Sequence, residues 1–266
     1  MRLLERTNRR VMLTPAGQIF QMRARLALEQ AEAAVAEARM AMLGEAGTLI
    51  LGFVSAALFS ILPRLLTRFR QQIPGARIEL EEMEPAAQLE ALKAERLDLG
   101  LMHAEVRSRE LETRLVSRER LIVAVPKSHP LARKARVPVR SLQQERILLP
   151  RRHEFPGLHD QIMLACQRAG FAPAELQYTR LLLTAVYLVS AGHGVALVPE
   201  SFEMHRISGV AYRPLTGPAA MIDLVAVWRK SNQAPLLLRM KRELALLSSR
   251  RGGGKRLEVC PGNRNC

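Results

Sequence analysis

The sequence predicts an α/β protein with two lobes of similar construction, preceded by a long helix and a short β-hairpin. Apolar strands alternate with helices of about ten residues, which is the pattern of βαβ units and a parallel sheet. The pattern occurs in residues 48–120 and again in residues 121–220, so two connections must join the halves. Before residue 48, apolar residues instead recur every seven positions, which is typical of one long helix.

The first fourteen residues are interpreted as a β-hairpin that leads directly into a helix. Two short extended pieces flank a polar, basic tip, and Thr14-Pro15 then opens the helix. Thr is a preferred N-cap, and Pro at the first helical position loses no hydrogen bond. Cationic side chains on a hairpin suit contact with DNA phosphates. The candidate phosphate contacts are Arg6, Thr7, Asn8, Arg9 and Arg10.

Residues 15–43 are expected to form one helix, about 43 Å long. A seam of apolar and small residues runs along it: Ile19, Leu26, Ala33 and Met40, with Met22, Ala36 and Leu43 near the companion position. We interpret the seam as a dimer interface, because its alanines permit close approach of a second helix. The alternative is that this helix lies on its own domain. Gly44 and Gly47 are expected to end the helix and supply a hinge.

The two lobes follow from the order of the remaining elements. In the first lobe we predict strands over 49–54, 76–82 and 97–102 and helices through 62–69 and 85–94. In the second we predict strands over 121–125, 146–149, 175–179, 195–198 and 210–215 and helices over 157–169 and 181–191. A strand over 222–228 and a helix over 234–247 close the fold. Ligands of open α/β sheets sit at the carboxyl ends of the strands, which points to a cleft between the lobes.

The composition is that of a globular protein, with 48% hydrophobic and 24% charged residues. The net charge of +15 is spread along the chain and is dense only in residues 249–266, a tail expected to be disordered. The three cysteines, Cys166, Cys260 and Cys266, show no metal-ligand or disulfide-framework spacing. Neither a secretory signal nor a membrane-spanning run is found. These features predict a cytoplasmic protein.

Catalytic motifs are missing from the sequence. It contains no G-x-S-x-G, H-E-x-x-H, P-loop or G-x-G-x-x-G pattern, and its six histidines are scattered singly. We therefore expect no enzymatic activity, no cofactor and no metal site.

Four segments, in the correct order, together with the hairpin, resemble LysR-type transcriptional regulators. They are Leu62-Pro63 with Phe69 and Pro74-Gly75, then Leu97-Asp98-Leu99-Gly100-Leu101, Val125-Pro126 with His129-Pro130-Leu131-Ala132, and Ala191-Gly192 with Gly194-Val195-Ala196-Leu197-Val198-Pro199. The resemblance runs from Leu4 to about Leu247. It implies a wing over 1–14, a linker and dimerisation helix with hinge over 15–47, and an effector-binding domain of the type II periplasmic-binding-protein fold over 48–248. Lobe I would comprise about 48–120 and 221–248, and lobe II about 121–220.

The position of the wing is unusual for that family. A helix-turn-helix that reads bases in the major groove precedes it there, whereas only Met1, Arg2 and Leu3 precede it here. The resemblance therefore implies a truncated regulator that keeps effector binding and homodimer or homotetramer formation, and contacts DNA weakly and non-specifically. Two alternatives remain open. The chain could be a cytoplasmic oligomerising fragment that acts as a dominant negative partner, or a solute-binding protein without DNA recognition.

Position by position, the resemblance places nine residues in the effector site: Ser55, Ala56, Glu84, Pro85, Ala86, His103, Pro150, Arg151 and Phe155. Ser55 is expected to cap a helix whose first amides hold an anion such as a small carboxylate, or to cap it without any ligand. Many relatives have Thr or Ser at Glu84. A carboxylate there would repel an anionic effector and suit a cationic or hydroxylated one, or it would simply cap its helix and face solvent.

The remaining expectations concern three side chains. His103 is placed to hydrogen-bond an effector, or is merely half-exposed. Phe155 is expected to stack on an aromatic or apolar effector. Arg180 replaces an often acidic or neutral residue, and is expected to add positive charge to the cleft.

Overall fold

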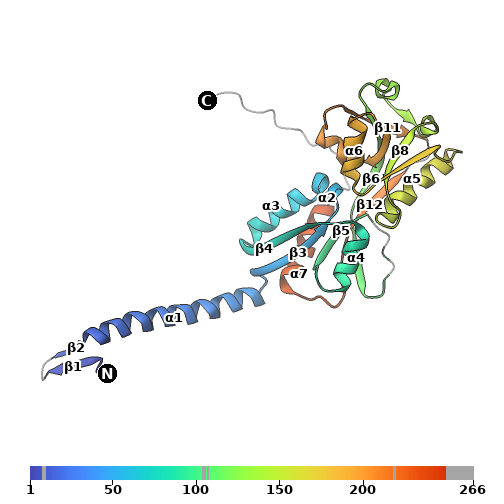
Figure 1. Cartoon of the computed structure of the whole chain (residues 1–266). Coiled ribbons are helices and arrows are strands. Elements are labelled where there is room, and N and C mark those ends of the chain that lie inside the picture. The colour runs from blue at the N-terminus through green and yellow to red at the C-terminus, as the bar shows by residue number, and fades with distance from the viewer. Residues whose placement is uncertain (8–9, 104–105, 107, 218–219, 250–266) are drawn as a thin grey trace.

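The computed structural model describes residues 1–7, 10–103, 106, 108–217 and 220–249, which form a hairpin, a long helix and a two-lobed α/β domain (Figure 1). The hairpin pairs β1 (Leu4–Thr7) with β2 (Arg10–Leu13) in antiparallel fashion. Three of the predicted phosphate contacts, Arg6, Thr7 and Arg10, lie in these strands. Asn8, Arg9 and residues 250–266 of the basic tail lie outside the described residues.

Helix α1 (Pro15–Met42) begins where the sequence predicted and ends one residue earlier. The Thr14 hydroxyl accepts a hydrogen bond from the Gly17 amide (2.9 Å) and donates one to the Arg2 carbonyl (2.9 Å). This cap fixes the hairpin to the helix. Gly17 is required by the close approach, because a Cβ at this position would lie 2.0 Å from the Leu3 carbonyl oxygen.

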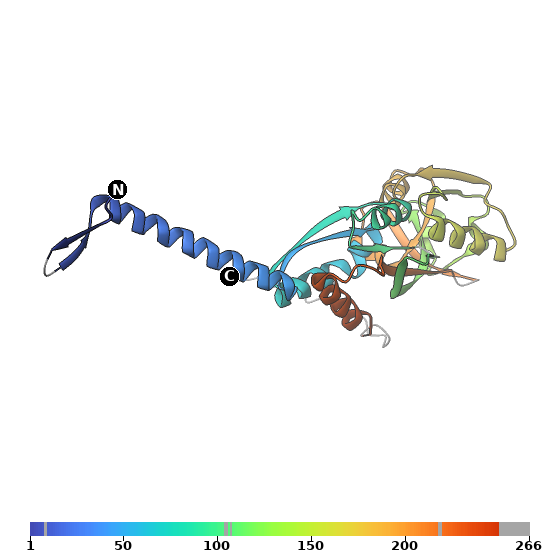
Figure 2. The same cartoon turned by 90° about the horizontal axis from the view of Figure 1, so that it is seen from below.

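The long helix projects away from the α/β domain (Figure 2). Gly17 is the one buried residue of α1, and its apolar seam is exposed, with Ile19 at 62%, Leu26 at 47% and Met40 at 38% exposure. The structure therefore does not support a helix that lies along its own domain. A dimer formed through the seam stays a prediction.

Lobe I contains β3 (Ala46–Phe53), α2 (Ser55–Ser60), α3 (Leu62–Gln72), β4 (Gly75–Glu82), α4 (Pro85–Lys93) and β5 (Leu99–Met102). Its strand order is β4-β3-β5, then β12 (Met221–Arg229) and β6 (Leu111–Pro126), with β3 parallel to both β4 and β5. The predicted strand over 49–54 begins earlier than expected, so Gly47 lies inside β3 rather than in a hinge. Gly44 makes the turn instead, at φ +65°.

Two long strands cross between the lobes. In lobe I, β6 (Leu111–Pro126) pairs antiparallel with β12 (Met221–Arg229) as far as Arg120. From Leu121 onward β6 pairs with β10 (Val195–Pro199), and from Ile122 with β11 (Val210–Thr216). The change of partner falls at residues 120–122, where the sequence analysis placed the boundary between the two lobes. The first ten residues of β6 were not expected to be a strand, because their alternation of charged side chains lacks an apolar face.

Lobe II is built from β8 (Arg146–Pro150), α5 (Pro156–Arg168), β9 (Glu175–Thr179) and α6 (Leu182–Ser190), together with β10 and β11. Strand β8 is parallel to both β10 and β9. Three 3-10 turns were not predicted, η1 (Pro130–Arg133), η2 (Val139–Leu142) and η3 (Glu200–His205), nor was the short strand β7 (Val137–Pro138). The closing helix α7 (Pro235–Ser249) returns to lobe I and packs against α3.

The buried apolar residues form one continuous cluster that runs through both lobes. Phe69 in lobe I and Phe202 in lobe II are fully buried, and the strands bury alternate or continuous apolar residues, as in β8 and β10. The two lobes also touch directly. The Phe59 ring of α2 meets the Phe202 ring edge-on at 4.9 Å and stacks on the His205 ring at 4.4 Å. Among the described residues, no helix has the length and apolar character needed to cross a membrane.

Candidate functional site

The candidate site lies where the strand ends of the two lobes meet. Strands β3, β4 and β5 end at residues 53, 82 and 102 in lobe I, and β8 and β9 end at residues 150 and 179 in lobe II. The predicted effector residues follow these ends directly. The parallel sheets therefore bring together segments that are far apart in the sequence, as the contact between Glu84 and Arg180, 96 residues apart, shows.

Ser55 occupies the first turn of α2 but does not cap it. The N-cap is Val54, and the helix has no side-chain cap hydrogen bond, so the predicted capping role of Ser55 is wrong. The structure buries Ser55 and Ala56, with 7% and 3% of their surfaces exposed. Anion binding at the α2 amides stays a prediction.

Glu84 forms an ion pair across the lobes instead of facing solvent. Its Oε1 accepts a hydrogen bond from the Arg180 Nε at 2.8 Å, and it makes no cap hydrogen bond to α4. The hydrogen bond from Arg180 holds the pKa of Glu84 below its ordinary value, against the opposing effect of burial. Glu84 occupies the N-cap position of α4, but the alternative in which its side chain faces solvent is wrong. The positive charge expected from Arg180 is compensated by Glu84. Pro85 and Ala86 follow in the first turn of α4, Pro85 buried and Ala86 half-buried.

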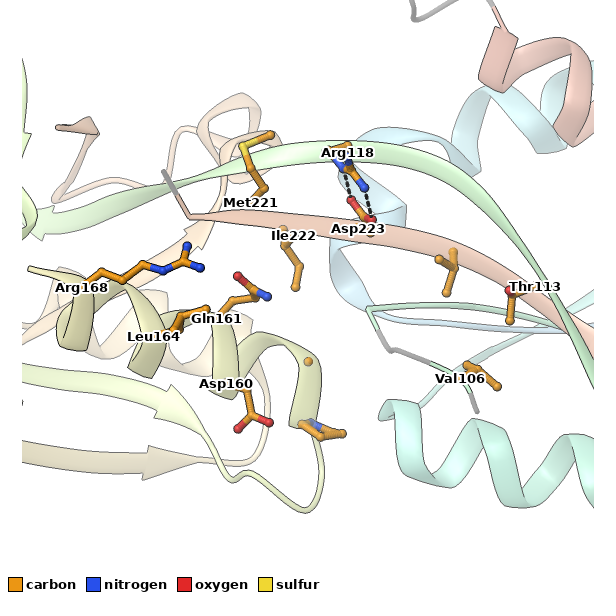
Figure 3. Close-up of a pocket in the computed structure, with 13 residues that line it drawn as sticks. Val106, Thr113, Arg118, Asp160, Gln161, Leu164, Arg168, Met221, Ile222 and Asp223 are labelled. Carbon is orange, nitrogen blue, oxygen red and sulfur yellow. Dashed lines mark hydrogen bonds and ion pairs between the residues drawn. The ribbon is translucent and has the colours of Figure 1, made fainter. Parts of the chain in front are cut away.

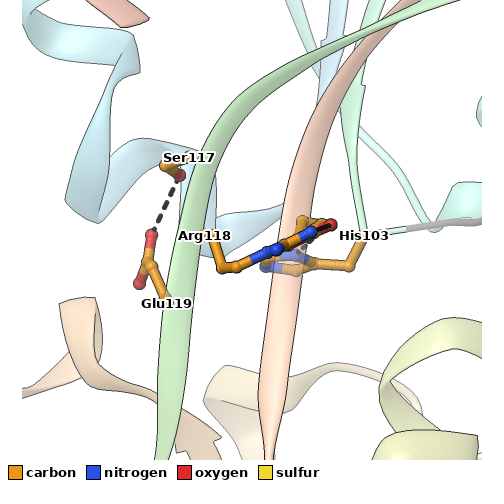
Figure 4. Close-up of polar contacts among 5 residues, drawn as sticks. His103, Ser117, Arg118 and Glu119 are labelled. Atoms are coloured by element: carbon orange, nitrogen blue, oxygen red, sulfur yellow. Dashed lines mark hydrogen bonds and ion pairs between the residues drawn. The ribbon is translucent and has the colours of Figure 1, made fainter. Parts of the chain in front are cut away.

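His103 is buried against β12, with 2% of its surface exposed. We call β6 and β12, the two strands that cross between the lobes, the hinge strands. Its Nδ1 lies 3.0 Å from the Asp223 carbonyl oxygen, so this nitrogen carries the proton and donates it (Figure 4). Burial lowers the pKa of His103, which keeps the imidazole neutral. The expectation of a half-exposed side chain is wrong. Its Nε2 has no hydrogen-bond partner among the described residues, and a contact with an effector stays a prediction.

A buried carboxylate on β6 was missed by the sequence analysis. Glu119 is 5% exposed, and it accepts a hydrogen bond from the Ser117 hydroxyl at 3.3 Å (Figure 4). It also accepts one from the Ser201 amide at 3.1 Å. Ser201 belongs to η3 in lobe II, so this side chain ties the hinge strand to that lobe. The local sequence does not distinguish Glu119 from the other charged residues around it. Its burial and its hydrogen bonds depend on how β6 pairs with strands of both lobes.

The loop after β8 places the remaining predicted residues. Pro150 is buried, whereas the Arg151 side chain is 54% exposed and its Nη1 lies 4.0 Å from a Glu154 carboxylate oxygen. Phe155 begins α5 as its N-cap and is 5% exposed, packed within the apolar core. Stacking of its ring on an effector stays a prediction.

A pocket of about 780 Å³ lies between α5 and the hinge strands, and we call it the hinge pocket (Figure 3). It is lined by Val106, Thr113, Arg118, Pro156, Gly157, Asp160, Gln161, Leu164, Arg168, Met221, Ile222, Asp223 and Val225. None of the nine predicted effector residues is among them, although Pro156 follows Phe155 directly. The sequence analysis missed this pocket because it depends on how α5 is docked on β12.

The described residues contain no metal-ligand cluster and no reactive thiol. Within the described ranges, no three His, Cys, Asp or Glu side chains are grouped to hold a metal ion. Cys166 is buried, and burial raises the pKa of its thiol to about 11, so it stays protonated and unreactive at neutral pH. Cys260 and Cys266 lie outside the described residues.

Comparison with known proteins identifies the fold. The LysR substrate binding domain matches residues 43–246. The chain is 32% identical over 235 residues to the regulator AlsR of Bacillus subtilis, covering 88% of this chain and 78% of AlsR. It is 34% identical over 236 residues to the regulator BenM of Acinetobacter baylyi, covering 88% of this chain and 77% of BenM.

Solved structures agree with the sequence matches. The structure of full-length CbnR complexed with its target DNA superposes with a TM-score of 0.80 at 26% identity, covering 93% of this chain and 84% of CbnR. The BenM effector-binding domain with its effector benzoate gives a TM-score of 0.67 at 31% identity, covering 80% of this chain and 98% of that domain. These relatives are transcriptional regulators rather than enzymes. The match over residues 43–246 and the two-lobed fold establish that the chain belongs to the LysR family of transcriptional regulators.

Proposed function

We propose that this chain senses a small molecule between its two lobes and passes the signal to a cytoplasmic transcription complex through α1. The single observation that carries the proposal is the Glu84–Arg180 ion pair, in which one predicted effector residue of lobe I holds a residue that follows β9 in lobe II. A ligand at this contact would alter the distance between the lobes. Ligands that prefer one lobe arrangement shift the population toward it.

The charges at this contact define what the effector must do. Glu84 and Arg180 satisfy each other, so an anionic effector competes with Glu84 for the guanidinium, and a cationic or hydroxylated one competes with Arg180 for the carboxylate. Arg151, whose side chain is largely exposed, supplies a second cation from the loop that joins β8 to α5. Benzoate is a suitable first probe, because the BenM effector-binding domain was solved with it.

The effector experiment is a calorimetric titration of the 266-residue chain with benzoate and with neutral benzamide. We expect saturable binding of one of them. If benzoate binds, Arg151→Ala should weaken it about tenfold, and Glu84→Gln should tighten it because Arg180 is freed. If benzamide binds, Glu84→Gln should weaken it about tenfold, because the amide loses a charged hydrogen-bond acceptor. Arg136→Ala, an exposed arginine elsewhere in lobe II, serves as the control and leaves binding unchanged. Equal binding by all four proteins would place the ligand away from the predicted residues.

We propose that this chain contacts DNA by electrostatic attraction to the phosphates and does not read the bases. The hairpin carries arginines that suit phosphate contacts, whereas base readout needs a structural element inside a groove. A titration against promoter DNA and scrambled DNA of equal length, repeated over a range of salt concentrations, tests this. We expect equal, steeply salt-dependent affinities. A large preference for the promoter would contradict the proposal.

A further inference from the structure

We propose that the outer end of lobe II carries a second DNA-contacting surface, which holds the phosphates of a duplex by charge and does not read its bases. The surface is formed by residues 127–142, a segment that we call the basic loop. It lies at the end of lobe II that is far from α1, and therefore far from the hairpin (Figure 1). The inference rests on the proposed function only in that DNA is the partner, and it adds a contact made by the α/β domain itself.

The charges of the basic loop all have one sign. No Asp or Glu occurs between Glu119 and Glu145. The basic loop holds five exposed Lys and Arg side chains: Lys127, Arg133, Lys134, Arg136 and Arg140. None of the five forms an ion pair with a described residue. The contrast with Arg118, an exposed arginine that Asp223 neutralises, shows that this end of lobe II is unusual in its lack of carboxylates.

A sixth cation joins the basic loop from β11. The Arg213 Nε and Nη2 atoms donate hydrogen bonds to the Ala132 carbonyl oxygen, at 3.0 and 2.6 Å, and its Nη1 donates one to the Tyr212 carbonyl oxygen at 2.7 Å. These acceptors are neutral, so no carboxylate compensates the charge of Arg213. Glu145, the acidic residue nearest in sequence, lies against the His129 imidazole, with its Oε2 at 3.3 Å from Nε2. The field at this end of the lobe is therefore positive, which attracts polyanions.

The basic loop is anchored to the lobe. His129 is the N-cap of η1, and its Nδ1 accepts a hydrogen bond from the Leu131 amide at 3.2 Å. Strand β7 pairs in parallel with β11, and Val137 is fully buried there. The cations therefore extend from a backbone that is already fixed, so binding to a partner costs little additional ordering of the chain.

The side chains of the basic loop suit a duplex better than a protein or a single strand. Protein interfaces have an apolar core with aromatic residues, and single strands are held by aromatic side chains on which bases stack. The basic loop contains no Phe, Tyr or Trp, and its larger apolar residues are all buried: Leu131, Val137, Val139 and Leu142. Its short 3-10 turns and the two-residue β7 do not fill a groove, so the phosphates are the target.

The test is a fluorescence anisotropy titration of a labelled, scrambled DNA duplex with the full chain, repeated over a series of salt concentrations. The lobe II variant combines Lys127→Gln, Arg133→Gln and Lys134→Gln. We expect it to bind about tenfold or more weakly at about 0.1 M salt. The slope of log affinity against log salt should fall in magnitude by about two to three, because each lost phosphate contact removes about 0.9. Lys127→Arg, Arg133→Lys and Lys134→Arg together should preserve both values, because the charges remain.

The matched control removes the same charge from lobe I. Arg64, Arg70 and Arg96 are exposed, and none of them forms an ion pair with a described residue. Replacing all three by Gln should leave the salt slope unchanged. An equal loss of affinity and slope in this control and in the lobe II variant would mean that only net charge acts, and would overturn the proposal.

A hairpin variant, Arg6→Gln with Arg10→Gln, separates the basic loop from the hairpin. If it loses binding and the lobe II variant binds as the unmodified chain does, the basic loop is overturned and the hairpin contact stands. A lower slope in the lobe II variant alone supports the basic loop and contradicts the hairpin contact. Absence of DNA binding by the unmodified chain overturns both.

Titration with polyglutamate tests an acidic protein segment as the partner of the basic loop. We expect the unmodified chain to bind the duplex far more tightly than polyglutamate, because the exposed side chains offer no apolar contact. A lobe II variant that loses polyglutamate binding and keeps its DNA affinity would assign the surface to a protein and overturn the proposal.

Discussion

The Glu84 carboxylate of lobe I accepts a hydrogen bond from the Arg180 guanidinium of lobe II at 2.8 Å. The Glu84 side chain is 12% exposed, whereas that of Arg180 is 77% exposed. The carboxylate is therefore largely buried, and the guanidinium that binds it is mostly in solvent. It is a direct polar link between two lobes that otherwise meet through η3, α2 and the hinge strands.

The Glu84–Arg180 pair is expected to affect the lobe arrangement more than overall stability, because exposed ion pairs are weak. Glu84→Gln should increase the mean separation of the lobes, seen as a larger radius of gyration in X-ray scattering. The control is Glu175→Gln, which breaks an exposed pair within lobe II, where Glu175 bonds Arg146 at 2.6 Å. This variant should leave the scattering curve unchanged. An unchanged curve for Glu84→Gln would show that the pair does not hold the lobes.

The same pair predicts a pH dependence. Because Arg180 lowers the pKa of Glu84, its stabilisation is fully present above the ordinary value of 4.5 and is lost as the pH falls through the lowered pKa. The free energies of unfolding of the unmodified chain and Glu84→Gln should therefore differ at neutral pH and converge in acid below pH 4.5. Chemical denaturation at a series of pH values measures this, and a difference that persists unchanged into strong acid would contradict it.

His103 predicts a second pH dependence, at higher pH. Its folded-state pKa is lowered by burial, so the unfolded chain binds a proton more readily, and stability declines as the pH falls below the ordinary value of 6.5. His103→Leu should cost about 1–3 kcal/mol at pH 7.5, because the Asp223 carbonyl loses its donor. It should also flatten the dependence between pH 6.5 and 5. The exposed His153 provides the control, and His153→Leu should leave that dependence unchanged.

The contact between Phe59 and Phe202 is expected to couple the lobes energetically. Phe202→Ala should destabilise the protein by about 3–5 kcal/mol, because the ring is fully buried. A double-mutant cycle with Phe59→Ala should give a coupling energy of about 0.5–1.5 kcal/mol for the edge-on pair. Phe171, which makes no ring contact with Phe59 among the described residues, should give additive effects in the same cycle.

The α1 seam predicts the oligomeric state. Leu26→Glu places a charge at the centre of the exposed seam, and it should shift the chain toward monomer in sedimentation velocity, because two carboxylates would face each other across a dimer. Ala38→Glu, an exposed position on α1 outside the seam, should not. Equal behaviour of the two variants would mean that the seam is not the dimer interface.

Prediction from the sequence succeeded where the determinants are local. The start of α1 depends on Thr14 and Pro15 alone, and the observed cap confirms it. The βαβ order was also predictable, since apolar periodicity and helix length are properties of short segments. It failed for the first half of β6, because Glu112, Arg114 and Arg118 resemble a solvated loop until β12 pairs with them.

The candidate site was only partly predictable for a related reason. The family resemblance gave positions such as Ser55 and Glu84, but not their partners. The Glu84–Arg180 contact joins residues 96 positions apart, and Glu119 meets Ser201 across 82 positions. The hinge pocket likewise requires the docking of α5 on β12, which no pattern within α5 reveals.

The sequence by itself determined the α/β class, the two-lobed order of elements, the long helix with its apolar seam and the family resemblance, because each depends on short-range patterns of apolar, capping and turn residues. The tertiary structure alone decided which charges are compensated. Arg180 was expected to add positive charge to the cleft and is paired, whereas Arg168 drew no notice in the sequence and lines the hinge pocket without an ion pair to any described residue. Electrostatic pairing acts over distances in space, and only the folded chain sets those distances.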